Sequence, residues 1–192
     1  MEKIYNLLYR LRIIKRWGTS INIISEDVSQ HSFYVAVITH ILCMIVTDIF
    51  GREIDASRSV VYALYHEIHE VYTAHIVSPI KNRDLNAKLC YGNIKLSYRN
   101  RIINLLPLEL RLDFSKVFIF NENDNMLKEI VEEADLIDAY CKCKFEYMNG
   151  NRDFKYKLEM YEGKIRNLRQ EKDYINYFFD NMIDFGDLEI YY

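Results

Sequence analysis

The sequence has little of what loop-rich or disordered proteins contain. Among its 192 residues there are only 6 glycines and 2 prolines, whereas half of the residues are hydrophobic and 14% are aromatic. This composition excludes a disordered chain and argues against a loop-rich sandwich, so a helical protein is favoured. The length fits one domain. A chain of this size buries about 70% of its unfolded surface, which is enough to fold without a disulfide or a structural metal.

Basic residues are not in excess either. Lysine and arginine total 25 and aspartate and glutamate total 28, which gives a net charge of −3. Proteins that bind nucleic acid normally present a strongly positive surface to the phosphate backbone, and that surface is not predicted here. We therefore expect no polynucleotide partner.

Cysteines and apolar runs give no sign of a zinc clamp, a leader or a membrane span. Cys141 and Cys143 are two residues apart and point to different helix faces, and Cys43 and Cys90 also lie in helical-looking segments. The N-terminus lacks the apolar region and cleavage site of a signal peptide, and no stretch approaches 18 uncharged apolar residues. The apolar run at 33–49 predicts a buried helix. We expect a cytoplasmic protein without a membrane partner.

Hydrophobic periodicity and capping residues predict six or seven helices. The predicted helices cover residues 4 to near 18, 28–50, 56–72, 84–106, 107–114, 123 or 124 to 148, and 152–181. Asp27 and Asp55 are N-cap candidates, and Ser78-Pro79 disfavours a helix within 73–83. The segment 18–27 is a polar connector, and the tail to Tyr192 is expected to be irregular. With almost no strand signal, residues 1–192 predict a single all-α domain, with a core at about 5–150.

The densest group of chemically active side chains lies at residues 65–70. Within one continuous helix, His66, Glu67 and Glu70 would form a polar arc on an otherwise apolar surface, and such groups need partners when buried. The His-Glu-x-x-His motif of zinc proteases is excluded, because its second histidine position is Glu70. His66 and Glu67 remain candidate metal ligands, to be completed by residues from other helices.

Two further segments offer such residues. His31 and His40 lie nine positions apart on the 28–50 helix and point to opposite sides, so at most one of them faces a given site. In the acidic segment 132–138, Asp135 lies at the edge of an apolar stripe, whereas Glu132 and Glu133 are expected to be solvated.

In this order, these residues resemble the HD-domain metal-dependent phosphohydrolases. The resemblance rests on Val28-Ser29-Gln30-His31-Ser32, on Tyr65-His66-Glu67 and on Glu133-Ala134-Asp135. The additional stretches Arg16-Trp17 and Ser78-Pro79-Ile80-Lys81 are similar to the bacterial HD-domain 5'-deoxynucleotidases, the YfbR-like proteins. The resemblance is continuous from about residue 5 to 150 and weaker to about 180.

The resemblance implies a single HD-domain helical bundle that holds one divalent cation. Its ligands would be His31, His66, Glu67 and Asp135, with Glu67 standing where the family has aspartate. Such a set suits Co²⁺, Mn²⁺ or Zn²⁺ better than Mg²⁺.

Glu70 matches the family's catalytic glutamate. Arg16, Trp17 and Lys81 would contact the substrate, as would His75, which stands in place of an aspartate near the sugar. The family cleaves deoxyribonucleoside 5'-monophosphates and forms homodimers.

The sequence thus predicts a metal-dependent 5'-nucleotidase acting on (deoxy)nucleoside 5'-monophosphates. Two alternatives stay open. One is a (deoxy)nucleoside triphosphate hydrolase on the same fold, because His75 and its loop would admit a longer phosphate chain. The other is a catalytically reduced nucleotide-binding or regulatory dimer, because Glu67 and His75 both depart from the family pattern.

Overall fold

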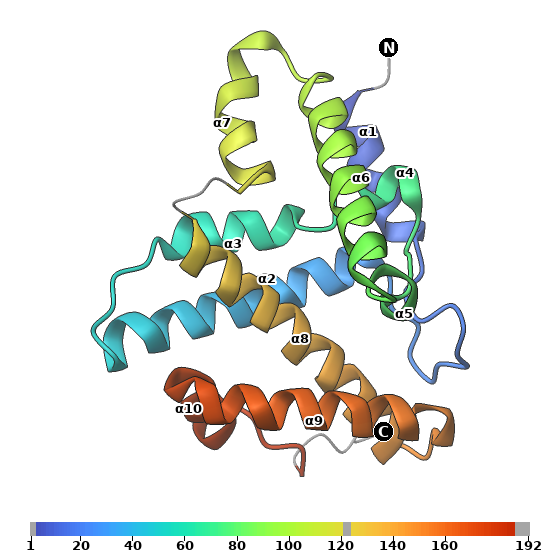
Figure 1. Ribbon diagram of the computed structural model, residues 1–192, viewed down its shortest axis with the longest axis vertical. Helices are drawn as coiled ribbons and strands as arrows, with labels where there is room; N and C mark the ends of the chain where they lie inside the picture. The colour runs from blue at the N-terminus through green and yellow to red at the C-terminus, as the bar shows by residue number, and fades with distance from the viewer. Residues whose placement is uncertain (1–2, 121–123, 187–192) are drawn as a thin grey trace.

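The computed structural model describes residues 3–120 and 124–186. Every regular element assigned within these ranges is a helix (Figure 1). The all-α prediction is confirmed, although the chain is divided more finely than expected. In chain order the elements are α1 (Ile4–Tyr9), η1 (Arg10–Ile13), α2 (Val28–Met44), the π-helical turn η2 (Ile45–Ile49), α3 (Ala56–Tyr65), α4 (Glu70–Thr73), α5 (Ser78–Lys81), α6 (Leu85–Ile103), α7 (Leu108–Phe118), α8 (Asn125–Met148), η3 (Arg152–Phe154), α9 (Lys155–Glu171) and α10 (Asp173–Asn181).

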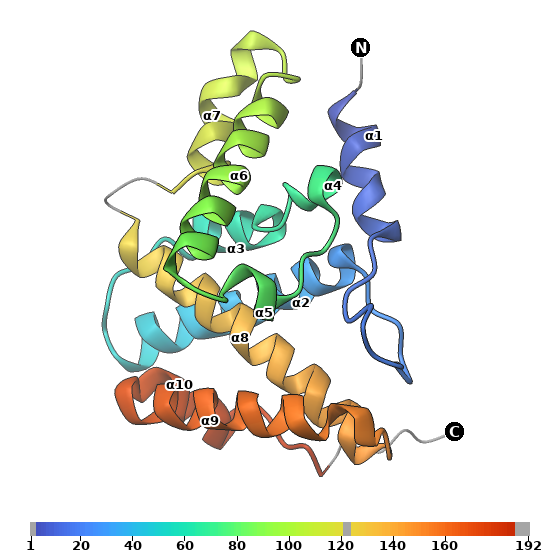
Figure 2. The same cartoon turned by 45° about the vertical axis from the view of Figure 1, so that its right-hand side comes forward.

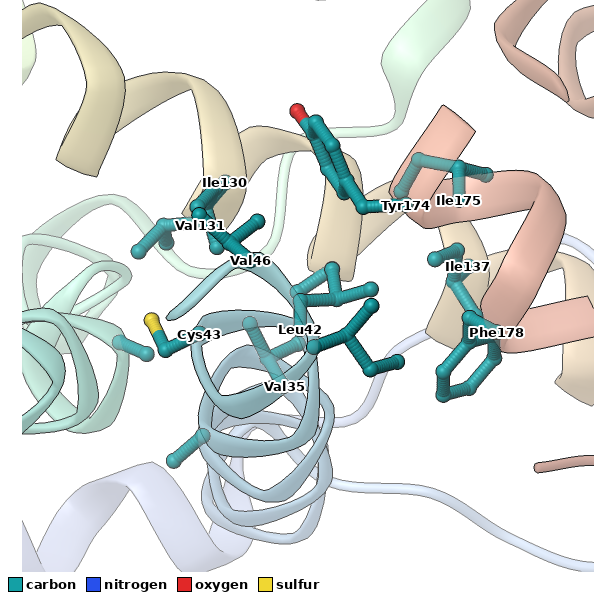
Figure 3. Close-up of a cluster of buried hydrophobic side chains, with 14 of the residues drawn as sticks. Val35, Leu42, Cys43, Val46, Ile130, Val131, Ile137, Tyr174, Ile175 and Phe178 are labelled. Atoms are coloured by element: carbon teal, nitrogen blue, oxygen red, sulfur yellow. The ribbon is translucent and has the colours of Figure 1, made fainter. Parts of the chain in front are cut away.

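The main core forms around α2. As predicted, Asp27 caps this helix, and it does so within a capping box in which the Asp27 side chain and the Gln30 side chain each bond the other's backbone N–H. Figure 3 shows Leu42 of α2 and Val46 of η2 close to Ile130 and Ile137 of α8, with residues of α10 on the far side. These side chains are buried. Their packing fixes α2 relative to α8, and each helix carries a candidate metal ligand.

The segment Val28–Ile49 is long and apolar enough to span a membrane by length and composition alone. It packs against α3 and α8, and His31, Ser32 and Thr39 are buried on it. A core helix accounts for this apolar character, in agreement with the interpretation of the sequence.

The predicted helix 56–72 is wrong in its middle, because it breaks after Tyr65 into turns at residues 66–69. The His66 Nδ1 atom bonds the Ala63 carbonyl oxygen at 2.6 Å, and Arg99 donates to the His66 carbonyl oxygen. Both carbonyls would otherwise accept helical bonds from residues four positions later. Side chains therefore take the two carbonyl oxygens that a continuous helix would use, and the polar arc predicted for a continuous helix does not form.

Other predicted boundaries also shift. The predicted loop 73–83 contains the short helix α5, which has Pro79 in its first turn. The predicted helix 152–181 is split at Lys172, where the backbone is extended. The first helix gives way to the 3-10 turn η1 and ends at Ile13, well before Gly18. The candidate cap Asn123 and the tail from 187 lie outside the described residues.

The connector 18–27 is fastened to the end of α8 by one buried carboxylate. Glu146 accepts hydrogen bonds from the backbone N–H groups of Ile23 and Ile24 at 2.9 and 3.2 Å, and Asn151 donates to it at 2.7 Å. These bonds hold the connector at Ile23 and Ile24. Trp17, the residue just before the connector, has a φ of 57°, which is an uncommon value for a residue other than glycine. Figure 2 shows this loop beside the start of α2.

Candidate active site

Three of the four predicted metal ligands meet in one place. His31 comes from the first turn of α2, His66 from the residue that ends α3, and Asp135 from the middle of α8. One ligand atom from each lies within 4.8 Å of the other two. Both histidines are buried, while Asp135 lies at the edge of the core, as predicted.

Hydrogen bonds orient both imidazoles toward this point. The His31 Nδ1 atom bonds Asp138 at 2.6 Å, and the His66 Nδ1 atom bonds the Ala63 carbonyl oxygen. Because carbonyl and carboxylate oxygens only accept, each Nδ1 carries a hydrogen, and Nε2 is the atom that each ring could offer to a metal. Both Nε2 atoms are buried; that of His66 has no hydrogen-bond partner, and that of His31 lies 3.0 Å from an Asp135 oxygen. Metal-ligating histidines are oriented in this way, so the group fits a divalent cation.

The electrostatics of the group agree with this assignment. Burial lowers the pKa of His66 to about 4, so its imidazole is neutral and available as a ligand. Burial and Arg16 both act to lower the pKa of His31. Hydrogen bonds to Asp135 and Asp138 outweigh them and raise this pKa to about 9. Although burial acts to raise the pKa of Asp135, His31 holds it well below its usual range. A proton thus lies between His31 and Asp135 where a cation would fit.

The fourth predicted ligand, Glu67, belongs to a neighbouring group. Its carboxylate lies with the His69 imidazole and the Glu70 carboxylate, all three residues buried, rather than with His31. The Lys81 ammonium lies 3.6 Å from an oxygen of Glu67 and 3.6 Å from an oxygen of Glu70. Burial acts to raise the pKa of Glu67, but Lys95 and Lys81 hold it well below its usual range. Lysines therefore supply the positive charge that these two carboxylates need.

Arg16 and Trp17 are placed together by an acid that the sequence interpretation did not include. Arg16 is buried, and its Nε atom lies 2.6 Å from Glu26, while the Trp17 Nε1–H donates to Glu26 at 3.3 Å. The Trp17 ring also packs against Phe154 and Tyr161, with centroids 5.6 and 6.3 Å away. These contacts hold Arg16 and Trp17, the two predicted substrate residues, side by side.

Two cavities adjoin the metal group. The first, of about 530 Å³, is lined by Arg16, Trp17 and His75, and its lining also includes the side chains of Met160 and Tyr161. The second, of about 690 Å³, lies toward α6 and is lined by Lys88, Lys95 and Arg99. Glu67, Lys81 and Asp135 line both cavities. Both volumes suit a small ligand.

Several contributors were missed or misplaced by the sequence interpretation. Asp138 had a usable signal, because it follows Asp135 by three residues on the same helix face. Tyr91, Lys95 and Arg99 also had one, because they recur every four residues along α6. Glu133 was expected in solvent, but it is buried and accepts a hydrogen bond from Tyr174 at 2.7 Å. His69 is buried, and its Nε2 atom lies 2.8 Å from the Tyr91 hydroxyl group.

Comparisons with known proteins identify relatives of this chain. A family described as "5'-deoxynucleotidase YfbR-like" matches residues 3–185. The 4'-phosphooxetanocin A phosphatase of Priestia megaterium is 38% identical over 178 residues, which cover 93% of this chain and 90% of that protein. A 5'-deoxynucleotidase of Pasteurella multocida is 35% identical over 148 residues, which cover 77% and 76%. An HD-domain phosphohydrolase structure from Listeria innocua shares the fold, with a TM-score of 0.77 at 19% identity, covering 93% of this chain and 85% of that one.

Proposed function

The chain belongs to the YfbR-like 5'-deoxynucleotidase family and is a hydrolase of the HD type, and we propose that it removes phosphate from (deoxy)nucleoside 5'-monophosphates. One observation carries the proposal. The buried imidazoles of His31 and His66 meet Asp135 in one group at the edge of a cavity lined by Arg16 and Trp17. The arrangement unites a cation site with room for an anionic, partly apolar ligand.

His31, His66 and Asp135 would hold the cation, with Glu67 as the fourth ligand once its carboxylate turns away from Lys81. A bound divalent cation lowers the pKa of water and neutralises charge on the phosphate. Nitrogen and oxygen ligands together suit Co²⁺, Mn²⁺ or Zn²⁺, whereas Mg²⁺ prefers oxygen ligands alone.

The other residues bind and orient the substrate. The Arg16 guanidinium, held by Glu26, offers its remaining N–H groups to the phosphate, and Lys81 adds a second positive charge. The first cavity takes the nucleoside against Trp17. Water attacks phosphorus and the bond to the 5'-oxygen breaks, while Glu70 governs proton transfer as the buried carboxylate of the site.

The test is phosphate release from a panel of ribo- and deoxyribonucleoside 5'-monophosphates with Co²⁺, Mn²⁺, Zn²⁺ or Mg²⁺. We expect release to require the cation and to fall at least about 100-fold in His66→Ala, because a metal ligand is lost. His40→Ala is the matched control, since His40 is exposed on the opposite side of α2. Silence of the wild type across the panel, or full activity of His66→Ala, would reject the proposal.

A triphosphate substrate is the second candidate, and the cavity toward α6 is the observation that favours it. Among the described residues, Lys88 and Lys95 line this cavity without an ion-pair partner. A phosphate chain extending past the metal group would meet both ammonium groups. Lys95→Ala should then raise the KM for dATP about tenfold more than the KM for dAMP. Equal changes for the two substrates would count against this candidate.

The reduced, regulatory alternative is favoured by the position of Glu67 outside the ligand group. If the wild type is inactive and Glu67→Asp restores phosphate release, this alternative is the better account.

For each of these functions we expect a cytoplasmic homodimer. Sedimentation that shows a monomer at micromolar concentration would contradict the dimer.

A further inference from the structure

His75 and Glu70 form a pair that the sequence pattern of the site does not explain. The His75 Nδ1 atom lies 3.1 and 3.2 Å from the two carboxylate oxygens of Glu70. Glu70 is fully buried, and the His75 side chain is 12% exposed. A carboxylate only accepts hydrogen bonds, so Nδ1 donates to Glu70.

His75 also lines the cavity proposed for the substrate. Its second ring nitrogen, Nε2, is separated from Nδ1 by one ring carbon and is the nitrogen that Glu70 does not bind. His75 lines the first cavity together with Arg16 and Trp17, where the nucleoside is placed, and it does not line the cavity toward α6. Glu70 itself lines neither cavity, so it reaches a substrate only through another group.

The backbone before His75 is held in a conformation that costs energy. Ala74 has φ 53° and ψ −179°, a region that residues other than glycine rarely adopt. The Ala74 N–H bonds the Glu70 carbonyl oxygen at 2.9 Å, which ends α4 and turns the chain sharply. This turn brings His75 back over Glu70. Strain of this kind persists where a side chain must be placed accurately.

We propose that His75 is the general acid that protonates the leaving 5'-oxygen, with Glu70 as its positioning residue. The proposal rests on the proposed nucleotidase function. In an in-line displacement the water enters opposite the leaving group, and His75 lines the cavity to which the nucleoside is assigned. As the bond between phosphorus and the 5'-oxygen breaks, its electron pair stays on that oxygen, which takes the proton from Nε2. The attacking water supplies two protons; one stays on the phosphate and the other restores the imidazolium.

Charged groups from several elements surround this pair. Glu70, from α4, contacts the ring directly and accepts the Nδ1 hydrogen. Lys81, from α5, lies 3.6 Å from the same Glu70 oxygen, and Arg16 lines the same cavity as His75. The pair resembles other acid–imidazole pairs, in which the carboxylate orients the ring and the ring moves the proton.

The experiment compares dAMP with its analogue in which sulfur replaces the bridging 5'-oxygen. A thiolate leaving group needs no proton, because thiol pKa values lie near about 8.5. His75→Asn keeps an N–H for Glu70 but has no proton to transfer. We expect it to lower kcat for dAMP about 100-fold, typical of losing an acid catalyst, and kcat for the sulfur analogue by less than about fivefold. The falling alkaline side of the dAMP pH–rate profile should also disappear.

Several outcomes separate this inference from the proposed function. Equal losses with both substrates, or an unchanged pH profile, would overturn the acid role while leaving the nucleotidase function intact. An inactive wild type would reject the nucleotidase function itself. Glu70→Gln should lose activity with dAMP more than with the sulfur analogue, because the imidazolium loses its partner. His69→Gln, at the neighbouring buried histidine, should show no difference between the two substrates.

Discussion

At the scale of single residues, Lys81 is the cation that two buried carboxylates share. Without its ammonium group, Glu67 and Glu70 would face each other in a buried site with His69 beside them. Two such charges are costly unless a positive charge compensates them. Lys81 therefore supplies the positive charge that a second metal ion would otherwise bring to these carboxylates, and we expect the site to bind one cation per chain.

Removing Lys81 should change that number. We expect Lys81→Ala to bind two Mn²⁺ ions per chain after dialysis, against one in the wild type, measured by elemental analysis. Lys155→Ala removes an exposed lysine side chain from α9 and should leave the number of bound ions at one. A count of one in Lys81→Ala would show that the acidic group takes no metal.

The strain at Ala74 gives a second prediction at this scale. Glycine adopts a φ of 53° with ψ near 180° far more readily than alanine, so Ala74→Gly should relieve strain. We expect the free energy of unfolding in urea to rise by about 1 kcal/mol. Ala87→Gly, within α6, should instead lower it by about 0.5–1 kcal/mol. Equal losses at both positions would mean that Ala74 carries no strain.

At the scale of elements, the predictable helices were those whose ends depend on nearby residues. The helix beginning at Val28 was predicted correctly because its cap, Asp27, is adjacent to it. The break after Tyr65 was not predictable, since it depends on Arg99, which lies 33 residues away in sequence. The helical angles drawn for residues 66–70 therefore do not apply, because His66 and Glu67 lie in a turn rather than a helix.

The connector 18–27 shows how a loop acquires a fixed position and a pH dependence. Burial acts to raise the pKa of Glu146, but Lys142, Asn151 and the Ile23 and Ile24 amides lower it below 4.5 overall. A lowered pKa in the folded state stabilises the fold at pH values above 4.5. That contribution is lost as the pH falls through the folded-state value.

Glu146→Gln should therefore lower the free energy of unfolding at pH 7 by about 1–3 kcal/mol, because charged hydrogen bonds are lost. The difference from the wild type should shrink below pH 4.5. Urea titrations at pH 7 and pH 4 measure both values. Glu159→Gln, on the exposed face of α9, is the control and should match the wild type at either pH. A difference that is constant with pH would refute the assigned charge.

At the scale of the whole molecule, the candidate metal site exists only when three helices are packed together. Its ligands come from α2, α3 and α8, which share the core of Figure 3. The sequence could supply His31, His66 and Asp135 through motif order. It could not show that Lys81 engages Glu67 or that Lys95 lines a second cavity, because these contacts depend on how α5 and α6 fold back over α8.

Because the unfolded chain separates these ligands, a cation binds the folded state alone and must stabilise it. We expect Tm to rise with Mn²⁺ concentration, by an amount equivalent to about 2.7 kcal/mol at 100 times the dissociation constant. His66→Ala should remove this dependence, since it deletes one of three ligands, whereas His40→Ala should keep it. Differential scanning calorimetry with and without EDTA gives the comparison. A wild-type Tm that does not change with Mn²⁺ would mean that the group is held together by the proton between His31 and Asp135 and not by a metal.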